Sequence, residues 1–370
     1  MKQILFVVNH LKGGGIEQVL LDLVSLLKNK YVIRILALYD CDSVYKEELS
    51  HLVKYDCLDK RRIIKFRPLL SLYSRLYDKD YIQRFLFRKY IQKNRFDTVI
   101  AFSDGFSVRL IAESNFGDSR KIAWVHTDFF DDENLKDWQL DQLQKLYENY
   151  DRVVLVSNLL KEKYEQRFGL KNGLCIYNSI NKNRISNDFN RTKEVNNGKL
   201  NFIAVGRLSW EKGFDRLILS LARLSFSLRN KCHLTIIGEG SERNNLESLI
   251  EINHVKDSVT LAGFVKNPFA VFQNADVLLM PSRFEGFGLV LLESLYMQIP
   301  IVSTDTAGAT EILQNGKYGI LLKNEDNAFD EILVKLISNP SMLIPYQNLS
   351  SEALERFDTN KIMKQVESIL

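Results

Sequence analysis

Few cysteines and short apolar runs exclude several classes of protein. The 370 residues include four cysteines, Cys41, Cys57, Cys175 and Cys232, and none belongs to a CxxC pair. Four isolated thiols make no disulfide framework, so we expect the chain to work in a reducing cytoplasm. No apolar run approaches the ~18 residues of a membrane span, and the first residues lack a signal-peptide cleavage pattern. We therefore expect a soluble or peripheral protein.

Two common nucleotide-binding motifs are also missing. The glycines of "HLKGGGIEQ" (His10–Gln18) do not form GxGxxG, which a nicotinamide-dependent dehydrogenase needs after its first strand. They do not form a P-loop either, because no Gly-Lys-Ser/Thr follows them. Glycines between a strand and a helix still let the backbone approach a phosphate or a sugar. A tight turn alone explains them equally well.

Short apolar segments alternate with amphipathic helical patterns along the chain. The alternation stops at residues 181–198, which are polar and rich in Asn, and we interpret them as a linker. A chain of this length has enough residues for two cores. The pattern predicts an α/β fold with two Rossmann-like, doubly wound domains that face each other across a cleft, with ligands at the carboxyl ends of the strands. The apolar segments are "ILFVVNH", "VIRILALYD", "DTVIAFS", "KIAWVHT" and "RVVLVSN" before residue 181, and "LNFIAVGRL", "CHLTIIGEG", "SVTLAGFV", "DVLLMPS", "IPIVSTD" and "YGILLK" after it.

Positive charge is concentrated in the segment from Lys60 to Arg95. It has 12 Lys or Arg residues against Asp78 and Asp80, which makes it +10, so with a total of +4 the rest of the chain is −6. Seven aromatic residues are interleaved with these charges. A solvated helix surface is one interpretation, and a patch that binds an anionic membrane is the other. We expect no nucleic acid partner, because no recognition motif accompanies the patch.

Two cations follow the first apolar segment of the second domain. Arg207 and Lys212 are five residues apart in "VGRLSWEKGFDRLI" (Val205–Ile218). Arg forks onto phosphate oxygens and Lys supplies a point charge, so the pair suits a diphosphate. A solvated loop is the alternative.

Two carboxylates flank a glycine-containing turn in "PSRFEGFGLVLLESL" (Pro281–Leu295). Glu285 precedes a predicted helix and Glu293 is eight residues further on, a separation of about 12 Å along a helix. That is too far for the carboxylate pair of a glycoside hydrolase. Gly286 and Gly288 leave the first N–H groups of the helix open to an anionic or hydroxyl-rich ligand.

Taken together and in their order along the chain, these motifs resemble those of the GT-B glycosyltransferases of glycosyltransferase family 4. The match covers most of the chain and is strongest from Gly206 to Glu311. One motif departs, because the family's "PNG" is "YNS" here (Tyr177–Ser179), and we expect this loop only to connect the domains. The matched motifs are E-x7-E (Glu285 and Glu293), GR…KG (Gly206, Arg207, Lys212 and Gly213), the glycine-rich first loop (Gly13, Gly14 and Gly15, with GG-x-E at Gly14 to Glu17), "IGEG" (Ile237–Gly240) and "AGATEIL" (Ala307–Leu313).

The resemblance implies a role for each motif. The donor would bind in the second domain, with its ribose on Glu293 and its diphosphate on Arg207 and Lys212. Its sugar would lie against Glu285. A lone His is more often structural, but the resemblance implies that His126 faces the donor sugar, with Asp128 nearby on the acceptor side. It thus implies catalytic roles for His126, Arg207, Lys212 and Glu285, and donor contacts at Gly14, Gly15, Gly206, Gly238, Val265, Gly286, Phe287, Gly288, Leu289 and Glu293.

The resemblance also implies the organisation and the reaction. We expect an acceptor-side domain at 1–180, the linker at 181–198, a donor domain at 199–349 and a C-terminal helix at about 350–370 that packs back on the first domain. The reaction would be retaining and free of cofactor and metal. It would move a hexose or N-acetylhexosamine, expected from a UDP-sugar, to a growing polysaccharide or lipid-linked glycan at the inner face of the plasma membrane.

Several alternatives remain open at this stage. A nucleotide-sugar epimerase of the same fold is the nearest enzymatic rival. A non-catalytic two-domain sugar-binding protein is the other, although such a receptor would need an export signal. Two DxD patterns, Asp40–Asp42 and Asp78–Asp80, lack supporting context, so we expect neither to bind metal. The sequence does not indicate the oligomeric state.

Overall fold

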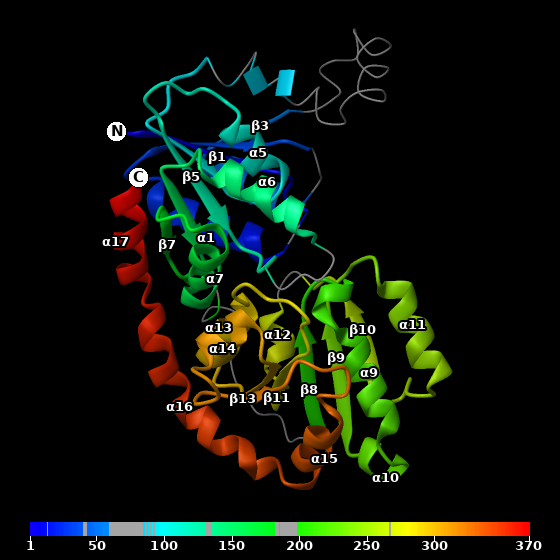
Figure 1. Ribbon diagram of the computed structural model, residues 1–370. Helices are drawn as coiled ribbons and strands as arrows, with labels where there is room; N and C mark the ends of the chain where they lie inside the picture. Colours follow the sequence, from blue (N-terminus) through cyan, green and yellow to red (C-terminus); the bar gives the residue numbers. More distant parts are fainter. Residues whose placement is uncertain are drawn as a thin grey trace, which may run out of the picture. The chain divides into compact units, whose positions relative to one another are not determined.

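The computed structural model describes residues 1–12, 14–39, 43–58, 84–85, 87–88, 91, 93–130, 135–181, 185, 198–265 and 268–370. The chain divides into two compact units, which we call unit 1 (Met1–Tyr177 with Asn360–Leu370) and unit 2 (Asn178–Thr359). Each unit has its own parallel sheet with helices (Figure 1). The predicted fold class, two Rossmann-like α/β domains, is confirmed.

The described part of unit 1 has a parallel sheet in the order β3-β2-β1-β4-β5-β6-β7. Its central strands are apolar on both faces, as expected for a parallel sheet covered by helices. Residues 4–7 of β1, for example, are fully buried. The strands are β1 (Gln3–Val8), β2 (Val32–Ala37), β3 (Lys54–Cys57), β4 (Thr98–Ala101), β5 (Arg120–Val125), β6 (Arg152–Leu155) and β7 (Gly173–Cys175).

Helices follow most of these strands, and local sequence sets where several of them begin. Ser43 and Ser157 cap α2 and α7, because each side-chain oxygen accepts a backbone N–H of the first helical turn. Gly169 ends α7 in the left-handed conformation. The helices are α1 (Gly15–Leu27), α2 (Val44–Leu52), α5 (Phe106–Ala112), α6 (Asp137–Tyr147) and α7 (Asn158–Phe168), with α17 (Thr359–Ile369) from the end of the chain.

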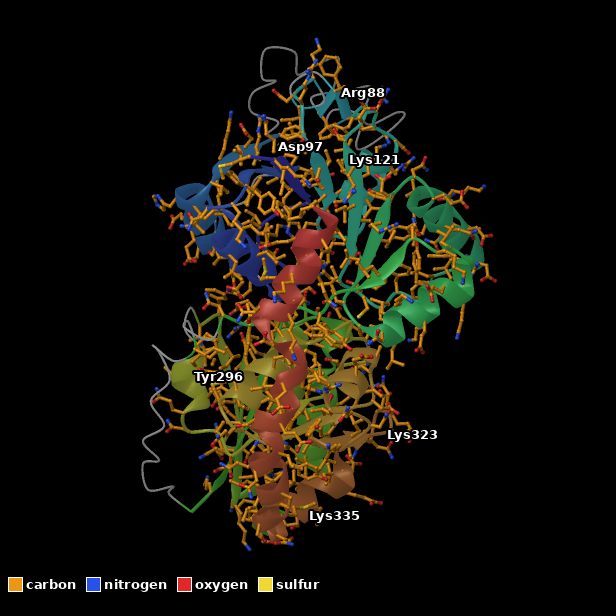
Figure 2. The ribbon with its side chains drawn as sticks, turned by 90° about the vertical axis from the view of Figure 1, so that its left-hand side faces the viewer. Arg88, Asp97, Lys121, Tyr296, Lys323 and Lys335 are labelled. Atoms are coloured by element: carbon orange, nitrogen blue, oxygen red, sulfur yellow. The ribbon has the colours of Figure 1, made fainter. Side chains whose placement is uncertain are left out.

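Helix α17 is tied to unit 1 at the amino edge of the sheet. The carbonyl oxygen of Leu370 accepts hydrogen bonds from Lys2 Nζ and Thr98 Oγ1, both at 3.0 Å. Arg120 donates to the carbonyl of Ile369 at 2.9 Å. Figure 2 labels Asp97 and Lys121, which flank these contacts at the start of β4 and near the start of β5. The preceding helix, α16 (Ile344–Leu354), belongs to unit 2.

The described part of unit 2 has a parallel sheet in the order β10-β9-β8-β11-β12-β13. Apolar residues of α9 recur at Phe214, Leu217, Ile218 and Leu221, which is the spacing of one helix face, and all four lie in the core. Helices α11 and α15 contribute to the same core. The strands are β8 (Leu200–Val205), β9 (Cys232–Ile237), β10 (Val259–Gly263), β11 (Val277–Met280), β12 (Ile301–Thr304) and β13 (Ile320–Leu322). The helices are α9 (Phe214–Arg223), α10 (Phe226–Arg229), α11 (Arg243–Ile252), α12 (Phe269–Phe272), α13 (Leu289–Tyr296), α14 (Ala307–Ile312), α15 (Asp330–Ser338) and α16, with 3-10 turns η2 (Trp210–Lys212), η3 (Pro340–Leu343) and η4 (Glu355–Phe357).

Strand order reverses once in each sheet. The reversal lies between β1 and β4 in unit 1 and between β8 and β11 in unit 2. Loops that leave the carboxyl ends of such strands diverge and open a crevice, where ligands of open α/β sheets bind. The loops after these four strands and their neighbours are therefore the places to look for a site.

Candidate functional site

The motifs expected to bind the donor meet at the strand reversal of unit 2. Gly206 and Arg207 directly follow β8, and Lys212 ends the 3-10 turn η2 in the same loop. Glu285 follows β11, the neighbour of β8 in the sheet. The topology thus brings together GR…KG and the first carboxylate of E-x7-E, which are more than 70 residues apart in sequence.

Lys212 and Glu285 form an ion pair in which Nζ lies 2.5 Å from Oε2. Both side chains are largely buried, at 25% and 14% exposed. Arg207 differs, because it is exposed and its side chain has no hydrogen bond or ion pair with any residue that the structure describes. This edge therefore holds one cation against a carboxylate and presents another to solvent.

Glycines let the loops after β8 and β9 cross in direct contact. A Cβ on Gly238 would lie 1.8 Å from the carbonyl oxygen of Gly206, and one on Gly240 would lie 2.1 Å from that of Leu208. The backbones are also joined, since the N–H of Gly206 donates to the carbonyl of Ile237 at 3.0 Å. The physical reason for the "IGEG" motif is this crossing, which any larger residue would block.

The loop after β11 holds η2 from the other side. A Cβ on Gly213 would lie 2.2 Å from the carbonyl oxygen of Pro281. Arg283 donates to the carbonyl of Trp210 at 2.8 Å and forms a bidentate pair with Asp215 at 2.7 and 2.9 Å. Its guanidinium also lies over the Trp210 ring, 4.8 Å from the centroid. Sequence reasoning missed Arg283, which fixes the loop that carries Lys212.

Helix α13 begins just after the glycine-containing turn. Gly288 caps it with φ +88°, a conformation that residues with a side chain rarely adopt. Phe287 is buried, and its ring packs edge-on against that of Phe357, with the ring centroids 5.8 Å apart. Glu293 is half-buried on this helix. Gly286 and Leu289 are the other residues of the turn that we expect to hold the sugar, and Gly286 is buried.

The loop after β12 packs against the turn that contains Glu285, at the carboxyl edge of the sheet in unit 2. The N–H of Gly308 donates to the carbonyl of Glu285 at 3.0 Å, and a Cβ on Gly308 would lie 2.3 Å from the carbonyl oxygen of Phe287. "AGATEIL" therefore packs against the backbone of the E-x7-E turn. The nearby hydroxyl of Thr306 is buried and has no hydrogen-bond partner in the described structure. Val265, another expected donor contact, is half-buried after β10.

In unit 1, the first glycine-rich loop leads into α1. Gly14 is the N-cap residue and Gly15 the first helical residue; Gly13 lies outside the described residues. Glu17, in the first turn, is buried, and its Oε1 lies 3.6 Å from Nδ1 of His10. The contact between the two side chains joins the end of β1 to α1.

His126 follows β5 at the carboxyl edge of the same sheet. It is 8% exposed and lies against Phe102, 4.8 Å away in an edge-on arrangement, and parallel to Trp124 at 6.4 Å. Burial lowers the pKa of His126 to about 3, so the imidazole is neutral at physiological pH. Its Nε2 atom is buried without a hydrogen-bond partner in the described structure.

The carboxylate of Asp128 contacts other residues of unit 1. It is 3% exposed, and its Oδ2 lies 2.6 Å from Nζ of Lys163 on α7. Its Oδ1 accepts the backbone N–H of Phe130 at 3.2 Å. Both carboxylate oxygens are therefore engaged by groups of unit 1.

Sequence reasoning missed Asp104, which lies between β4 and α5. Its Oδ2 accepts the backbone N–H groups of His126 and Thr127 at 3.3 and 3.2 Å. Asn9, at the end of β1, holds the same loop, because its side chain donates to the carbonyl of Asp104 at 2.6 Å and accepts the N–H of Ser107 at 2.9 Å. The only signal in the sequence is an Asp–Gly pair directly after an apolar segment.

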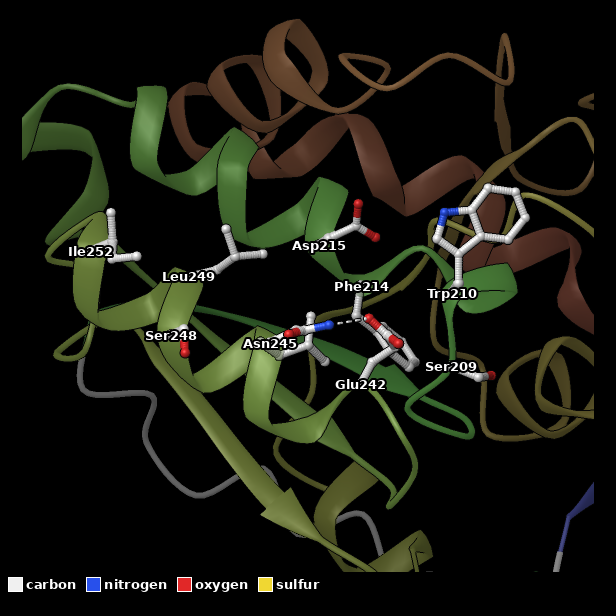
Figure 3. Close-up of a pocket in the computed structure, with 10 residues that line it drawn as sticks. Ser209, Trp210, Phe214, Asp215, Glu242, Asn245, Ser248, Leu249 and Ile252 are labelled. Atoms are coloured by element: carbon white, nitrogen blue, oxygen red, sulfur yellow. Dashed lines mark hydrogen bonds between the residues drawn. The ribbon is translucent and has the colours of Figure 1, made fainter.

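A separate pocket of about 390 Å³ lies in unit 2 between η2 with α9 and helix α11 (Figure 3). Its rim includes Trp210, which is 51% exposed. Polar side chains in it already have protein partners: Asn245 donates to Glu242 at 2.9 Å, and Asp215 binds Arg283. We therefore interpret it as a groove between helices. The lining residues are Ser209, Trp210, Phe214, Asp215, Glu242, Asn245, Leu246, Ser248, Leu249 and Ile252.

Some expectations concern residues that the structure does not describe. Both DxD patterns, Asp40–Asp42 and Asp78–Asp80, lie outside the described residues, as does most of the basic segment from Lys60 to Arg95. Among the residues that are described, no helix has the length and apolar character needed to cross a membrane.

Comparison with known proteins identifies the family. Residues 13–184 match the family model described as Glycosyltransferase Family 4, and residues 186–356 match that of Glycosyl transferases group 1. The chain is 26% identical to N-acetylgalactosamine-N,N'-diacetylbacillosaminyl-diphospho-undecaprenol 4-alpha-N-acetylgalactosaminyltransferase of Campylobacter jejuni, over 98% of each chain. It is 28% identical to an uncharacterized 41.2 kDa protein in the cps region of Klebsiella pneumoniae, over 75% of this chain and 77% of that one.

Solved structures show the same fold. The crystal structure of HepE from Anabaena, in complex with UDP and glucose, superposes with a TM-score of 0.80 over 100% of this chain and 99% of that one, at 20% identity. TarM of S. aureus, as a G117R mutant in a complex that includes UDP, also gives a TM-score of 0.80, at 15% identity. Together, the two family models and the ordered motifs show that this chain belongs to the GT-B glycosyltransferases of family 4.

Proposed function

We propose that this glycosyltransferase moves a hexose or N-acetylhexosamine from a UDP-sugar to a growing polysaccharide or lipid-linked glycan, with retention and without a metal ion. The observation that carries the proposal is the ion pair of Lys212 with Glu285, beside the exposed Arg207, at the strand reversal of unit 2. Two cations and a carboxylate at one edge suit a ligand that has a diphosphate next to a sugar.

In the proposed reaction, unit 2 supplies fixed charge. The bond between the sugar C1 and the diphosphate oxygen breaks, and a new bond from C1 to the acceptor oxygen forms on the same face. The acceptor hydroxyl proton passes to the leaving phosphate oxygen. Arg207 and Lys212 stabilise the negative charge that develops on the diphosphate. Glu285 and the backbone of the turn before α13 hold the sugar, and Glu293 holds the ribose.

The proposed substrates are supported by relatives. The name of the Campylobacter jejuni relative describes transfer of N-acetylgalactosamine to a glycan on diphospho-undecaprenol. The Anabaena neighbour was solved with UDP and glucose. A UDP-activated sugar and a polyprenyl-diphosphate-linked acceptor are therefore the first pair to test. Such an enzyme would act in cell-surface glycan biosynthesis on the cytoplasmic side of the membrane.

A transfer assay with anomeric readout tests this proposal. The protein would be incubated with UDP-, GDP- and dTDP-sugars and a polyprenyl-diphosphate-linked acceptor, and the product followed by proton NMR. We expect a new α-linked sugar from a UDP-sugar with an α-linked leaving group. Inversion at C2 of the free nucleotide sugar without transfer would instead indicate an epimerase. Saturable binding without any turnover would indicate a sugar-binding protein.

Membrane association is a second part of the proposal. In the described part of the basic segment, Arg88 is exposed (labelled in Figure 2) and Phe85 is 45% exposed. Phe87 is buried against Phe116, with the ring centroids 5.6 Å apart, and so anchors the segment to unit 1. Arg84 is already paired with Glu113 at 3.2 Å. Arg88 is therefore the better residue with which to test attraction to an anionic surface.

Vesicle cosedimentation measures this attraction. A basic residue near an anionic surface contributes about 1 kcal/mol, which is screened within a Debye length of about 8 Å at physiological salt. Reversal of charge in Arg88→Glu should weaken binding to anionic vesicles several-fold and leave nucleotide-sugar binding unchanged. Lys335→Glu, an exposed site in unit 2, is the matched control. Equal binding of the unsubstituted protein to neutral and anionic vesicles would contradict the electrostatic part of the proposal.

A further inference from the structure

Two buried polar atoms without hydrogen-bond partners in the described structure lie on neighbouring loops of unit 1. They are Oδ1 of Asp104, after β4, and Nε2 of His126, after β5. Buried polar groups are nearly always paired, because an unpaired one costs its full desolvation free energy. A third such atom, Nδ1 of His10, follows β1 at the same carboxyl edge, where strand order reverses nearby. Three unpaired buried atoms at one edge of a sheet suggest a role in the reaction.

The other oxygen of Asp104 holds the turn that carries His126. Oδ2 accepts the N–H groups of His126 and Thr127, at 3.3 and 3.2 Å. Asn9 in turn braces the Asp104 loop from the end of β1. A carboxylate that accepts two backbone N–H groups fixes the direction of the following residues, and charge strengthens such hydrogen bonds roughly twofold.

The protonation of Asp104 can change near neutral pH. Burial raises the pKa of this carboxyl to about 6, although the hydrogen bonds from Thr127 and His126 act in the opposite direction. Other titratable groups face it or lie on adjoining loops. From α6, Tyr147 feels the charge of Asp104, which is one cause of its raised pKa, after burial. Nδ1 of His10, on the β1 loop, lies 3.6 Å from Oε1 of Glu17 on α1.

We propose that Asp104 is a positioning residue for transfer, which, as a carboxylate, fixes the His126–Thr127 backbone and so sets the orientation of the His126 imidazole. Its role differs from that expected of Asp128, an acceptor-side residue whose carboxylate binds Lys163. The inference rests on the proposed transferase function for its kinetic readout. It also has a direct structural readout, so the positioning role of Asp104 and the transferase function can be tested separately.

The structural readout is the amide NMR signals of His126 and Thr127. In the unsubstituted protein, both should shift with pH, with a midpoint near 6, because protonation of Asp104 weakens the hydrogen bonds that they donate. Asp104→Asn keeps an acceptor oxygen but cannot titrate, so the shift should vanish. Asp97→Asn is the matched control, because Asp97 accepts the N–H of Gln3 at 2.6 Å at the amino edge of the same sheet. The shift should persist in this control. Persistence in Asp104→Asn would overturn the proposal.

The kinetic readout separates positioning from general support of the fold. Because Asp104 is protonated below about pH 6, we expect the unsubstituted protein to lose activity there. Asp104→Asn should lower kcat about tenfold or more, leave the KM for the nucleotide sugar unchanged and remove this pH dependence. Its melting temperature near pH 7.5 should rise, because a buried charge has been removed. The losses from Asp104→Asn and His126→Gln should not add in the double variant, because one residue acts through the other. A lower melting temperature together with a raised KM, or fully additive losses, would overturn the proposal. If no nucleotide sugar is turned over, only the transferase function fails, since the NMR result stands by itself.

Discussion

The carboxyl edge of the sheet in unit 1 holds buried groups whose protonation can change, whereas that in unit 2 holds an ion pair and an exposed cation. Asp104 and His126 each have a buried atom without a described partner and a strongly shifted pKa. Lys212 and Glu285 are paired, and Arg207 is open to solvent. The first kind of edge can respond to pH and the second can stabilise a fixed anion.

The largest expected effect comes from the fixed charges of unit 2. Lys212→Ala or Arg207→Ala should lower kcat by roughly 10²–10³-fold, the usual effect of removing one electrostatic donor. Steady-state kinetics at saturating donor measures it. Lys335→Ala removes an exposed charge on α15 and should leave kcat unchanged. Near-normal turnover in both Lys212 and Arg207 variants would mean that the charged edge does not act on the diphosphate.

A smaller effect, on stability, should come from Gly238, which lets the loop after β9 cross the loop after β8. Gly238→Ala forces a Cβ to within 1.8 Å of a backbone oxygen, and we expect a loss of roughly 3 kcal/mol in the free energy of unfolding, the upper end for overpacking. Gly117→Ala is the control, because nothing lies within 4 Å of its Cβ and only its φ of +63° opposes substitution. It should lose about 1 kcal/mol. Urea denaturation compares them, and equal losses would show that the crossing is not tightly packed.

The free energy of unfolding should depend on pH through two buried groups of unit 1, His126 and Asp104. The folded-state pKa of His126 is lowered to about 3, so the unfolded chain binds this proton first and stability falls as pH falls below about 6.5. The pKa of Asp104 is raised to about 6, so the folded chain binds that proton first and stability rises as pH falls from 6 to 4. The two terms oppose each other, at roughly 3 kcal/mol each over this range.

Single variants should separate the opposed contributions of His126 and Asp104 to stability. Relative to the unsubstituted protein, His126→Gln should gain stability between pH 7 and pH 4. Asp104→Asn should be more stable at pH 7 and lose that advantage by pH 4. Chemical denaturation at several pH values measures both. Parallel stability curves for all three proteins would mean that these groups do not titrate in the folded state as their burial implies.

The smallest expected effect is that of metal removal. Because the charge on the diphosphate is assigned to Arg207 and Lys212, transfer should continue unchanged after dialysis against EDTA. Assays with and without added Mg²⁺ or Mn²⁺ check this. A strict requirement for either ion would transfer the electrostatic role from the protein side chains to a metal.

The sequence predicted correctly those features that depend on short, continuous patterns of residues. The alternating pattern predicted both sheets, and the motif spacing predicted the family. Pairing of Lys212 with Glu285 follows from the neighbouring places of β8 and β11 in a doubly wound sheet. Asp104 was missed because no motif beyond an Asp–Gly pair marks it, and its hydrogen bonds to His126 and Thr127 are seen only in the folded sheet. The sequence also gives no sign that the carboxylate of Asp128 binds Lys163, 35 residues later; its expected place on the acceptor side stays a prediction.

The return of α17 to unit 1 has a consequence for biosynthesis. Residues 360–370, which bind Thr98 and Arg120 through the carbonyls of Leu370 and Ile369, leave the ribosome after all of unit 2. At 5–20 residues per second, the interval between residue 177 and residue 360 is roughly 10–40 s. During that time, the first sheet is exposed at its amino edge while the second unit is being made. The contacts that complete the nascent first unit therefore form only after the second unit has been synthesised.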